Sequence, residues 1–127
     1  MIRRILAAGA AAAVASVMFS APQASAASTF CVQTTDKHKG YPAGGEACWT
    51  PNGDKLEGCD LEADGLRPSL TMTYAGGSFS FDVYGGKGKC NSGVDNLREG
   101  TRVTVKVCLQ KGDAGREVFC ASESGYA

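Results

Sequence analysis

The feature that most constrains the fold is a pair of alternating segments joined by two glycines, in residues 70–83. Apolar residues alternate with threonine before the glycines, and with serine or aspartate after them. A period of two is typical of strands that bury one face and leave the other in water. Gly76 and Gly77 tolerate the positive φ angles of a two-residue hairpin turn. We therefore predict an antiparallel hairpin whose facing apolar pairs are Tyr74–Phe79, Met72–Phe81 and Leu70–Val83.

A second hairpin is predicted in residues 46–60 by strong turn chemistry. Proline, asparagine and glycine stand together in residues 51–54, where proline presets φ and Asn-Gly accepts positive φ. A four-residue loop there would pair Thr50 with Lys55 and Trp49 with Leu56. Trp49 is then either a core aromatic, which is the favoured reading for a lone tryptophan in a small domain, or part of an exposed platform with Tyr41.

A third hairpin is predicted at the end of the chain. Residues 101–109 alternate, with valine and leucine on one face, and residues 116–121 return across a three-residue loop, 113–115. Such a loop places a glycine, here Gly115, in the left-handed conformation. The register sets Cys108 opposite Cys120 and Leu109 opposite Phe119, and leaves residues 122–127 as a frayed tail.

These hairpins, with a leading strand in residues 29–34, define an all-β fold. No segment after residue 26 carries a convincing helical period. Turn signals recur at short intervals, as in sandwiches and barrels. We predict a small antiparallel β-sandwich, or a partly open barrel, of about six or seven strands.

Residues 1–26 have the pattern of a secretory signal peptide. Arg3 and Arg4 precede an apolar run over residues 5–19, and small residues at 24–26 form a cleavage site. The run is too short and alanine-rich for a good membrane span. No cysteine lies near the cleavage site, so we expect no lipid anchor there. Residues 27–127 would form one secreted domain with 11 basic and 13 acidic residues. That balance offers no attraction to nucleic acid or to an anionic membrane.

Six cysteines lie after the predicted cleavage site. An even number in a short exported chain indicates three disulfides, which stabilise a domain whose core is small. No pair has the C-x-x-C spacing of zinc or thioredoxin-like redox sites, and His38 is the only histidine. We expect no metal and no cofactor. The six are Cys31, Cys48, Cys59, Cys90, Cys108 and Cys120.

Three loops carry residues that are typical of chemical sites. Residues 60–65 resemble the opening of a calcium loop, but Thr71 stands where the bidentate glutamate belongs, so a tight acidic connection is favoured. Residues 85–90 resemble a phosphate loop but lack its first glycine and its Ser/Thr. His38 is read as a solvated loop residue rather than a catalytic base, because no nucleophile motif accompanies it.

Several short motifs resemble those of a known group. They are the run 45–49, then 53–56, Cys59-Asp60, 63–65, 97–101, 105–108 and Cys120. Together they are similar to a group of small secreted actinobacterial proteins, of the kind found in Streptomyces. The group is disulfide-linked, β-rich and largely without assigned function, so the resemblance implies a fold and a compartment but no activity.

The disulfide pairing rests partly on this resemblance. Cys108–Cys120 follows from the hairpin register. The resemblance implies that the cysteines at 59, 90, 108 and 120 are shared by the group, which leaves Cys59–Cys90 as the second pair. Cys31–Cys48 is then the remaining pair among the fifteen possible connectivities.

Three classes of function compete. A non-catalytic extracellular binding domain needs only a rigid scaffold with variable loops, and it is favoured. An inhibitor of a secreted protease or glycosidase is the alternative, with residues 36–45 or 84–91 as the inhibitory loop. An enzyme is disfavoured, because the carboxylates show no recognisable pairing. We expect a monomer that binds an extracellular protein or polysaccharide, with Tyr41, Trp49 and Tyr84 as the candidate partner surface.

Overall fold

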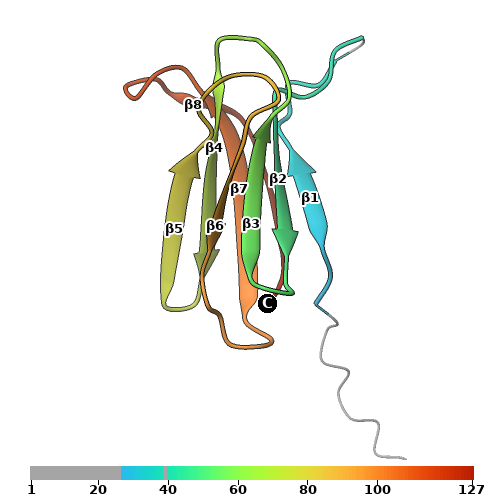
Figure 1. Cartoon of the computed structure of the whole chain (residues 1–127), viewed down its shortest axis with the longest axis vertical. Helices are drawn as coiled ribbons and strands as arrows, with labels where there is room; N and C mark the ends of the chain where they lie inside the picture. The colour runs from blue at the N-terminus through green and yellow to red at the C-terminus, as the bar shows by residue number, and fades with distance from the viewer. Residues whose placement is uncertain (1–26, 39) are drawn as a thin grey trace, which may run out of the picture.

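Eight strands in two antiparallel sheets make up the fold (Figure 1). The structure is a computed structural model that describes residues 27–38 and 40–127, so the predicted signal peptide lies outside the described residues. Within that part of the chain, no helix is long and apolar enough to cross a membrane. The strands are β1 (Phe30–Gln33), β2 (Gly45–Thr50), β3 (Lys55–Asp60), β4 (Arg67–Tyr74), β5 (Gly77–Asp82), β6 (Cys90–Val94), β7 (Arg102–Gln110) and β8 (Glu117–Tyr126).

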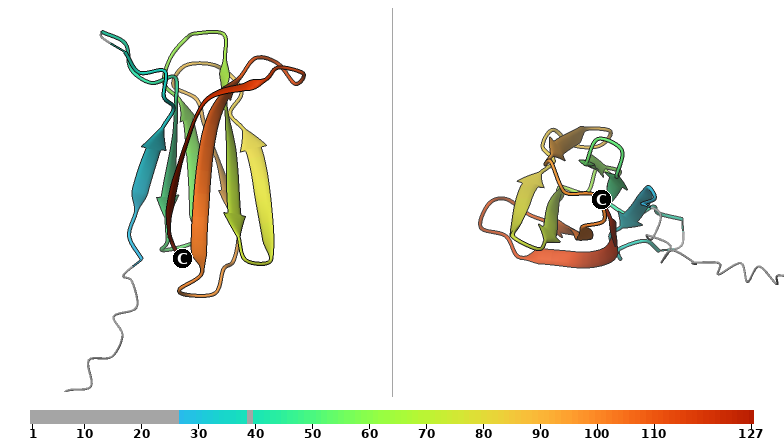
Figure 2. Two further views of the ribbon diagram at one scale, coloured as in Figure 1. Left: turned by 180° about the vertical axis from the view of Figure 1, so that it is seen from behind. Right: turned by 90° about the horizontal axis from the view of Figure 1, so that it is seen from below.

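The two sheets lie face to face, as the end-on panel of Figure 2 shows. One has the strand order β1-β2-β3-β6 and the other β5-β4-β7-β8. Alternate residues of the central strands face inward, so the core is built from both sheets. Its largest fully buried apolar side chains are Trp49, Leu56, Leu70, Met72, Val83, Val103, Val105, Val107 and Leu109. The prediction of an all-β sandwich with three disulfides is confirmed, with β6 as an additional strand.

The hairpin of β2 and β3 has the predicted register. Thr50 pairs with Lys55 and Trp49 with Leu56, across the four-residue loop 51–54. Gly53 adopts a φ of 94°, which is the conformation that the Asn-Gly sequence favours. Trp49 is fully buried, and its indole N–H donates to the Tyr126 carbonyl at 3.2 Å. The core reading of Trp49 is therefore confirmed.

The register predicted for the central hairpin is wrong by two residues. Met72 faces Phe79 and Leu70 faces Phe81, because the two-residue loop is 75–76 rather than 76–77. Gly76 takes the positive φ of 96°, while Gly77 already pairs with Tyr74. A shift of two keeps every side chain on its face of the sheet, so the alternating pattern fits both registers equally well.

The third hairpin departs from the prediction beyond Cys108. A bulge between Val107 and Leu109 sets Leu109 opposite Val118, not Phe119, and Phe119 takes a φ of 55°. The loop is 111–116, and its left-handed glycine is Gly112 rather than Gly115. The tail predicted to fray forms the end of β8. Its last residue, Ala127, exchanges backbone hydrogen bonds of 2.8 Å with residues 100 and 101.

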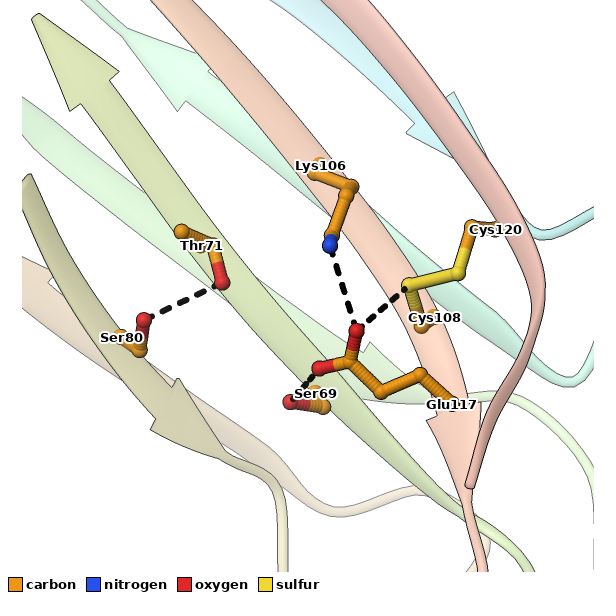
Figure 3. Close-up of a disulfide and its surroundings, with 7 residues drawn as sticks. All are labelled: Ser69, Thr71, Ser80, Lys106, Cys108, Glu117 and Cys120. Atoms are coloured by element: carbon orange, nitrogen blue, oxygen red, sulfur yellow. Dashed lines mark hydrogen bonds and ion pairs between the residues drawn. A yellow bond between two sulfur atoms is a disulfide. The ribbon is translucent and has the colours of Figure 1, made fainter.

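All three predicted disulfides are present, and each ties an edge strand to its neighbour. Cys31–Cys48 joins β1 to β2, Cys59–Cys90 joins β3 to β6, and Cys108–Cys120 joins β7 to β8. Figure 3 shows the last of these beside Glu117, whose carboxylate accepts from Lys106 at 3.2 Å and Ser69 at 3.4 Å. An edge strand has a partner on one side only, so a covalent link to that partner restrains the strand most prone to detach.

Candidate functional site

Four loops gather at one end of the sandwich, which we call the loop end (top of Figure 1). They are residues 34–44, 61–66, 83–89 and 111–116. The chain reverses direction at each strand of an antiparallel fold, so alternate connections return to the same end. Backbone hydrogen bonds of 2.8–3.0 Å join the first three loops to each other or to neighbouring strands, as between Leu61 and Gly44 and between Thr35 and Phe119. The fourth loop is joined to β4 by the ion pair between Asp113 and Arg67. The loop end is therefore a single continuous surface.

Two of the three aromatic residues predicted for a partner surface lie at the loop end. Tyr41 is 57% exposed and Tyr84 is 63% exposed. Trp49 does not belong with them: it is 0% exposed in the core, so its place in the predicted partner surface is corrected. The ring of His38 lies 4.9 Å from that of Tyr41, and its Nδ1–H donates to the Asp36 carbonyl at 2.8 Å. His38 thus helps to shape the first loop.

A cleft of about 420 Å³ opens between the other three loops. Its wall combines carboxylates, two basic side chains, an exposed aromatic ring and several glycines. Glycines leave backbone N–H and C=O groups accessible, because no side chain shields them. The lining residues that carry functional groups are Asp60, Glu62, Asp64, Arg67, Tyr84, Lys87 and Gln110.

Arg67 organises one wall of this cleft. Its Nε donates to Asp82 at 2.8 Å and a terminal nitrogen donates to Asp113 at 2.6 Å, so strand β5 and the loop 111–116 are tied to one guanidinium. Its Cζ lies 4.9 Å from the centre of the Tyr84 ring, a cation–π distance. Tyr84 is thus held in place while most of its surface stays open to solvent.

Asp60 joins two of the loops from below. Its N–H donates to the Lys89 carbonyl at 2.9 Å, and its carbonyl accepts from the Gly88 N–H at 2.8 Å. Its carboxylate is almost wholly buried and accepts from the Glu62 N–H at 3.2 Å. Burial raises the pKa of Asp60, the Glu62 hydrogen bond lowers it, and the negative charge of Asp64 raises it; the net shift is upward.

Three carboxylates from two loops also meet at the loop end. Oxygens of Asp36, Glu62 and Asp64 lie within 4.8 Å of one another, which is a spacing that a hard cation such as calcium could bridge. Asp36 is already occupied, because it accepts from the Gly44 N–H at 3.0 Å and from Thr34 Oγ1 at 2.5 Å. Both bonds lie within the loop 34–44, and the Leu61 N–H joins that loop to the loop 61–66 by donating to the Gly44 carbonyl at 2.9 Å. The tight acidic connection predicted for residues 60–65 stays a prediction.

Two other clusters of metal-ligand residue types cannot act as metal sites. Each combines one glutamate with two cysteines of a disulfide, namely Glu46 with Cys31 and Cys48, and Glu117 with Cys108 and Cys120. Metals bind the thiolate form of cysteine, and a disulfide sulfur has none to offer. The sulfur contact of Glu117 in Figure 3, at 3.6 Å, is likewise a packing contact, because the sulfur carries no hydrogen.

The sequence singled out Tyr84 and residues 60–65 but missed Arg67, Asp36 and Asp113. The correct hairpin register would have revealed Arg67, because continuing that register two residues past the end of β5 sets Arg67 opposite Tyr84. Asp36 and Asp113 reach the site from loops far away in the chain, and no local spacing signals them.

Comparisons with protein-family models, with curated proteins and with solved structures found no match. The resemblance to small secreted actinobacterial proteins therefore stays a prediction. The site has to be interpreted from its own geometry and chemistry.

Proposed function

We propose that this protein is a secreted, non-catalytic binding protein that holds an extracellular partner at its loop end. The observation that supports it best is Tyr84, a largely exposed aromatic ring fixed at the rim of a cleft by Arg67. Aromatic residues are enriched at binding hot spots, and a ring that is already held loses little freedom on binding. Loops on a rigid sandwich are a common way to present such a surface.

The disulfides and the expected signal peptide support an extracellular site of action. Three disulfides, with no free cysteine in the described residues, fit an oxidising compartment. The export step has its own test. We expect the exported protein to have the mass of residues 27–127, and an intact N-terminus in mass spectrometry would contradict it.

The charge of the cleft suggests the chemistry of the partner. Its two basic groups are Arg67, already paired with Asp82 and Asp113, and Lys87, whereas Asp60, Glu62 and Asp64 bring three acids. We expect a partner rich in hydrogen-bond donors, such as a polysaccharide hydroxyl array or a basic protein segment.

The test starts by identifying what the mature protein retains from culture supernatant, and by pull-down on polysaccharides and peptidoglycan. Tyr84→Ala should weaken the interaction at least about tenfold, as loss of a hot spot does. Tyr84→Phe keeps the ring and should retain most of the binding, and Val118→Ala, on β8, is a surface control. Binding that survives both Tyr84→Ala and Tyr41→Ala would refute the loop end as the site.

The alternative function, inhibition of a secreted protease or glycosidase, uses the same surface. Residues 34–38 and 40–44 extend beyond the strands of the sandwich (Figure 1), and the exposed Tyr41 is among them. Titration of a panel of secreted proteases and amylases distinguishes the two functions, because only an inhibitor would abolish turnover at stoichiometric amounts. Hydrolysis of any substrate by the protein itself, lost on a single carboxylate or His38 substitution, would overturn the non-catalytic proposal.

A further inference from the structure

The edge strand β6 presents unpaired backbone groups to solvent. On its other side it pairs with β3, where the Asp60 N–H donates to the Lys89 carbonyl at 2.9 Å. Backbone groups of successive residues in an antiparallel strand point to opposite sides. The 4.1 Å between the α-carbons of Cys59 and Cys90 agrees, because non-hydrogen-bonded pairs are the closer ones. The groups that point away from β3 are those of Cys90, Ser92 and Val94.

Two of the three other edge strands, β1 and β8, are protected in ways that β6 is not. On one side of the sandwich β1 and β8 cover each other, with the Phe30 ring against Gly125 and a hydrogen bond of 3.0 Å from the Thr35 N–H to the Phe119 carbonyl. Strand β8 also carries a bulge and two glutamates. Strand β6 has no charge, no proline and no bulge, which are the usual devices that prevent edge pairing.

The sequence around β6 is complementary to itself in the antiparallel direction. A two-fold axis through Ser92 sets Lys89 of one copy opposite Asp95 of the other, so unlike charges meet at both ends. The same axis sets Val94, which is 70% exposed, opposite the exposed Cys90 of the second copy. An exposed apolar side chain thus meets an exposed disulfide. Cys90, Ser92 and Val94, whose backbone groups point away from β3, thus lie opposite one another across the axis.

We propose that two copies of this protein pair through β6, in antiparallel register centred on Ser92. The two sheets β1-β2-β3-β6 then form one eight-stranded sheet with an isologous interface. The Ser92 N–H, which now donates to Asn91 Oδ1 at 2.9 Å, exchanges that acceptor for the carbonyl of the second copy. Antiparallel pairing points the two loop ends in opposite directions, so the dimer is bivalent.

The interface is one short strand from each copy, so the dimer is weak and forms at high concentration. Sedimentation velocity of the mature protein from about 10 μM to about 1 mM should show the mass rising from monomer to dimer. Val94→Lys should weaken the dimer at least about tenfold by burying an unpaired charge. Val118→Lys, at a valine 38% exposed on β8, is the matched control and should dimerise like the unaltered protein. A monomer at the highest concentration, or equal loss in both variants, would overturn the proposal.

A charge exchange tests the register. Lys89→Glu and Asp95→Lys should each fail to dimerise, because each places like charges opposite one another. An equimolar mixture of the two should form a heterodimer, since the mixed pair restores unlike charges at both ends. A mixture that stays monomeric would overturn the register.

Asp95 accepts a hydrogen bond from the Tyr74 hydroxyl, so Asp95→Lys also removes a contact between the two sheets. A second measurement therefore tests the proposal without that variant. Amide exchange in the unaltered protein should slow with concentration at Cys90 and Val94, and Lys89→Glu should abolish that slowing. Concentration-dependent protection on any other strand, in place of β6, would refute the proposal.

Discussion

Removal of the Cys59–Cys90 disulfide should destabilise the protein more than removal of either other disulfide. The cross-link spans 31 residues of sequence, against 17 for Cys31–Cys48 and 12 for Cys108–Cys120. The chain-entropy relation then gives about 3.7 kcal/mol for the first and about 3.1 and 2.8 kcal/mol for the others. The structure adds a local reason, because β6 is an edge strand whose other ties to the sandwich are few.

Urea unfolding of the Cys59→Ala/Cys90→Ala double variant measures the effect. The single tryptophan, buried in the core, reports global unfolding. With a urea dependence of about 1.5 kcal/mol/M, the midpoint should fall by about 2.5 M. Amide exchange should show β6 opening while β4 and β7 stay protected. The matched control is Cys108→Ala/Cys120→Ala. A loss below about 1 kcal/mol, or β6 amides as protected as those of β7, would refute the reasoning.

Three further predictions concern the core and the loop end. Phe81→Ala should lower the free energy of unfolding by about 2 kcal/mol, less than the 3–5 kcal/mol typical of a fully buried phenylalanine, because Phe81 is partly exposed. The control Ser78→Ala, on the outer face of the sheet, should lower it by almost nothing. Equal losses in the two variants would contradict the inward placement of Phe81. Millimolar calcium should move the melting temperature by less than about 1 °C, because hydrogen bonds already join the acidic loops. A rise of several degrees that Glu62→Gln abolished would instead show a calcium site. The raised pKa of Asp60 means that its protonated form stabilises the folded state, and that this contribution is lost as pH rises above about 4. Asp60→Asn should therefore gain stability relative to the unaltered protein as the pH rises from about 4 toward neutral, and parallel urea midpoints across that range would contradict it.

Turn residues in the sequence predicted a hairpin correctly where they allow only one position for its loop. In the β2–β3 hairpin, proline and Asn-Gly left only one loop compatible with the flanking pattern, and the register came out correctly. In the central hairpin, adjacent glycines offered two loops one residue apart. Moving the loop by one residue changes the register by two and leaves the apolar face unchanged, so hydrophobic pattern could not choose between them.

Features that depend on distant contacts were beyond the sequence. The bulge at Phe119 and the pairing of the C-terminal tail are stabilised by strand β7 and by residues 100 and 101. Strand β6 has neither alternation nor β-branched residues before Val94. It is held by its ladder with β3, which no sequence pattern indicated, and by the Cys59–Cys90 disulfide, which the resemblance did predict.

Strand β6 decides the geometry of the candidate site, although it contributes none of the residues that line the cleft. In an antiparallel sandwich each strand reverses the direction of the chain, so the number of strands before a loop decides the end at which that loop lies. Without β6, the loop 111–116 would fall at the end opposite to loops 61–66 and 83–89. With β6 it joins them, and Asp113 reaches Arg67 at 2.6 Å, which helps to hold the guanidinium beneath Tyr84. The candidate site therefore could not be assembled from its own residues alone, because its geometry depends on counting a strand that lies outside it.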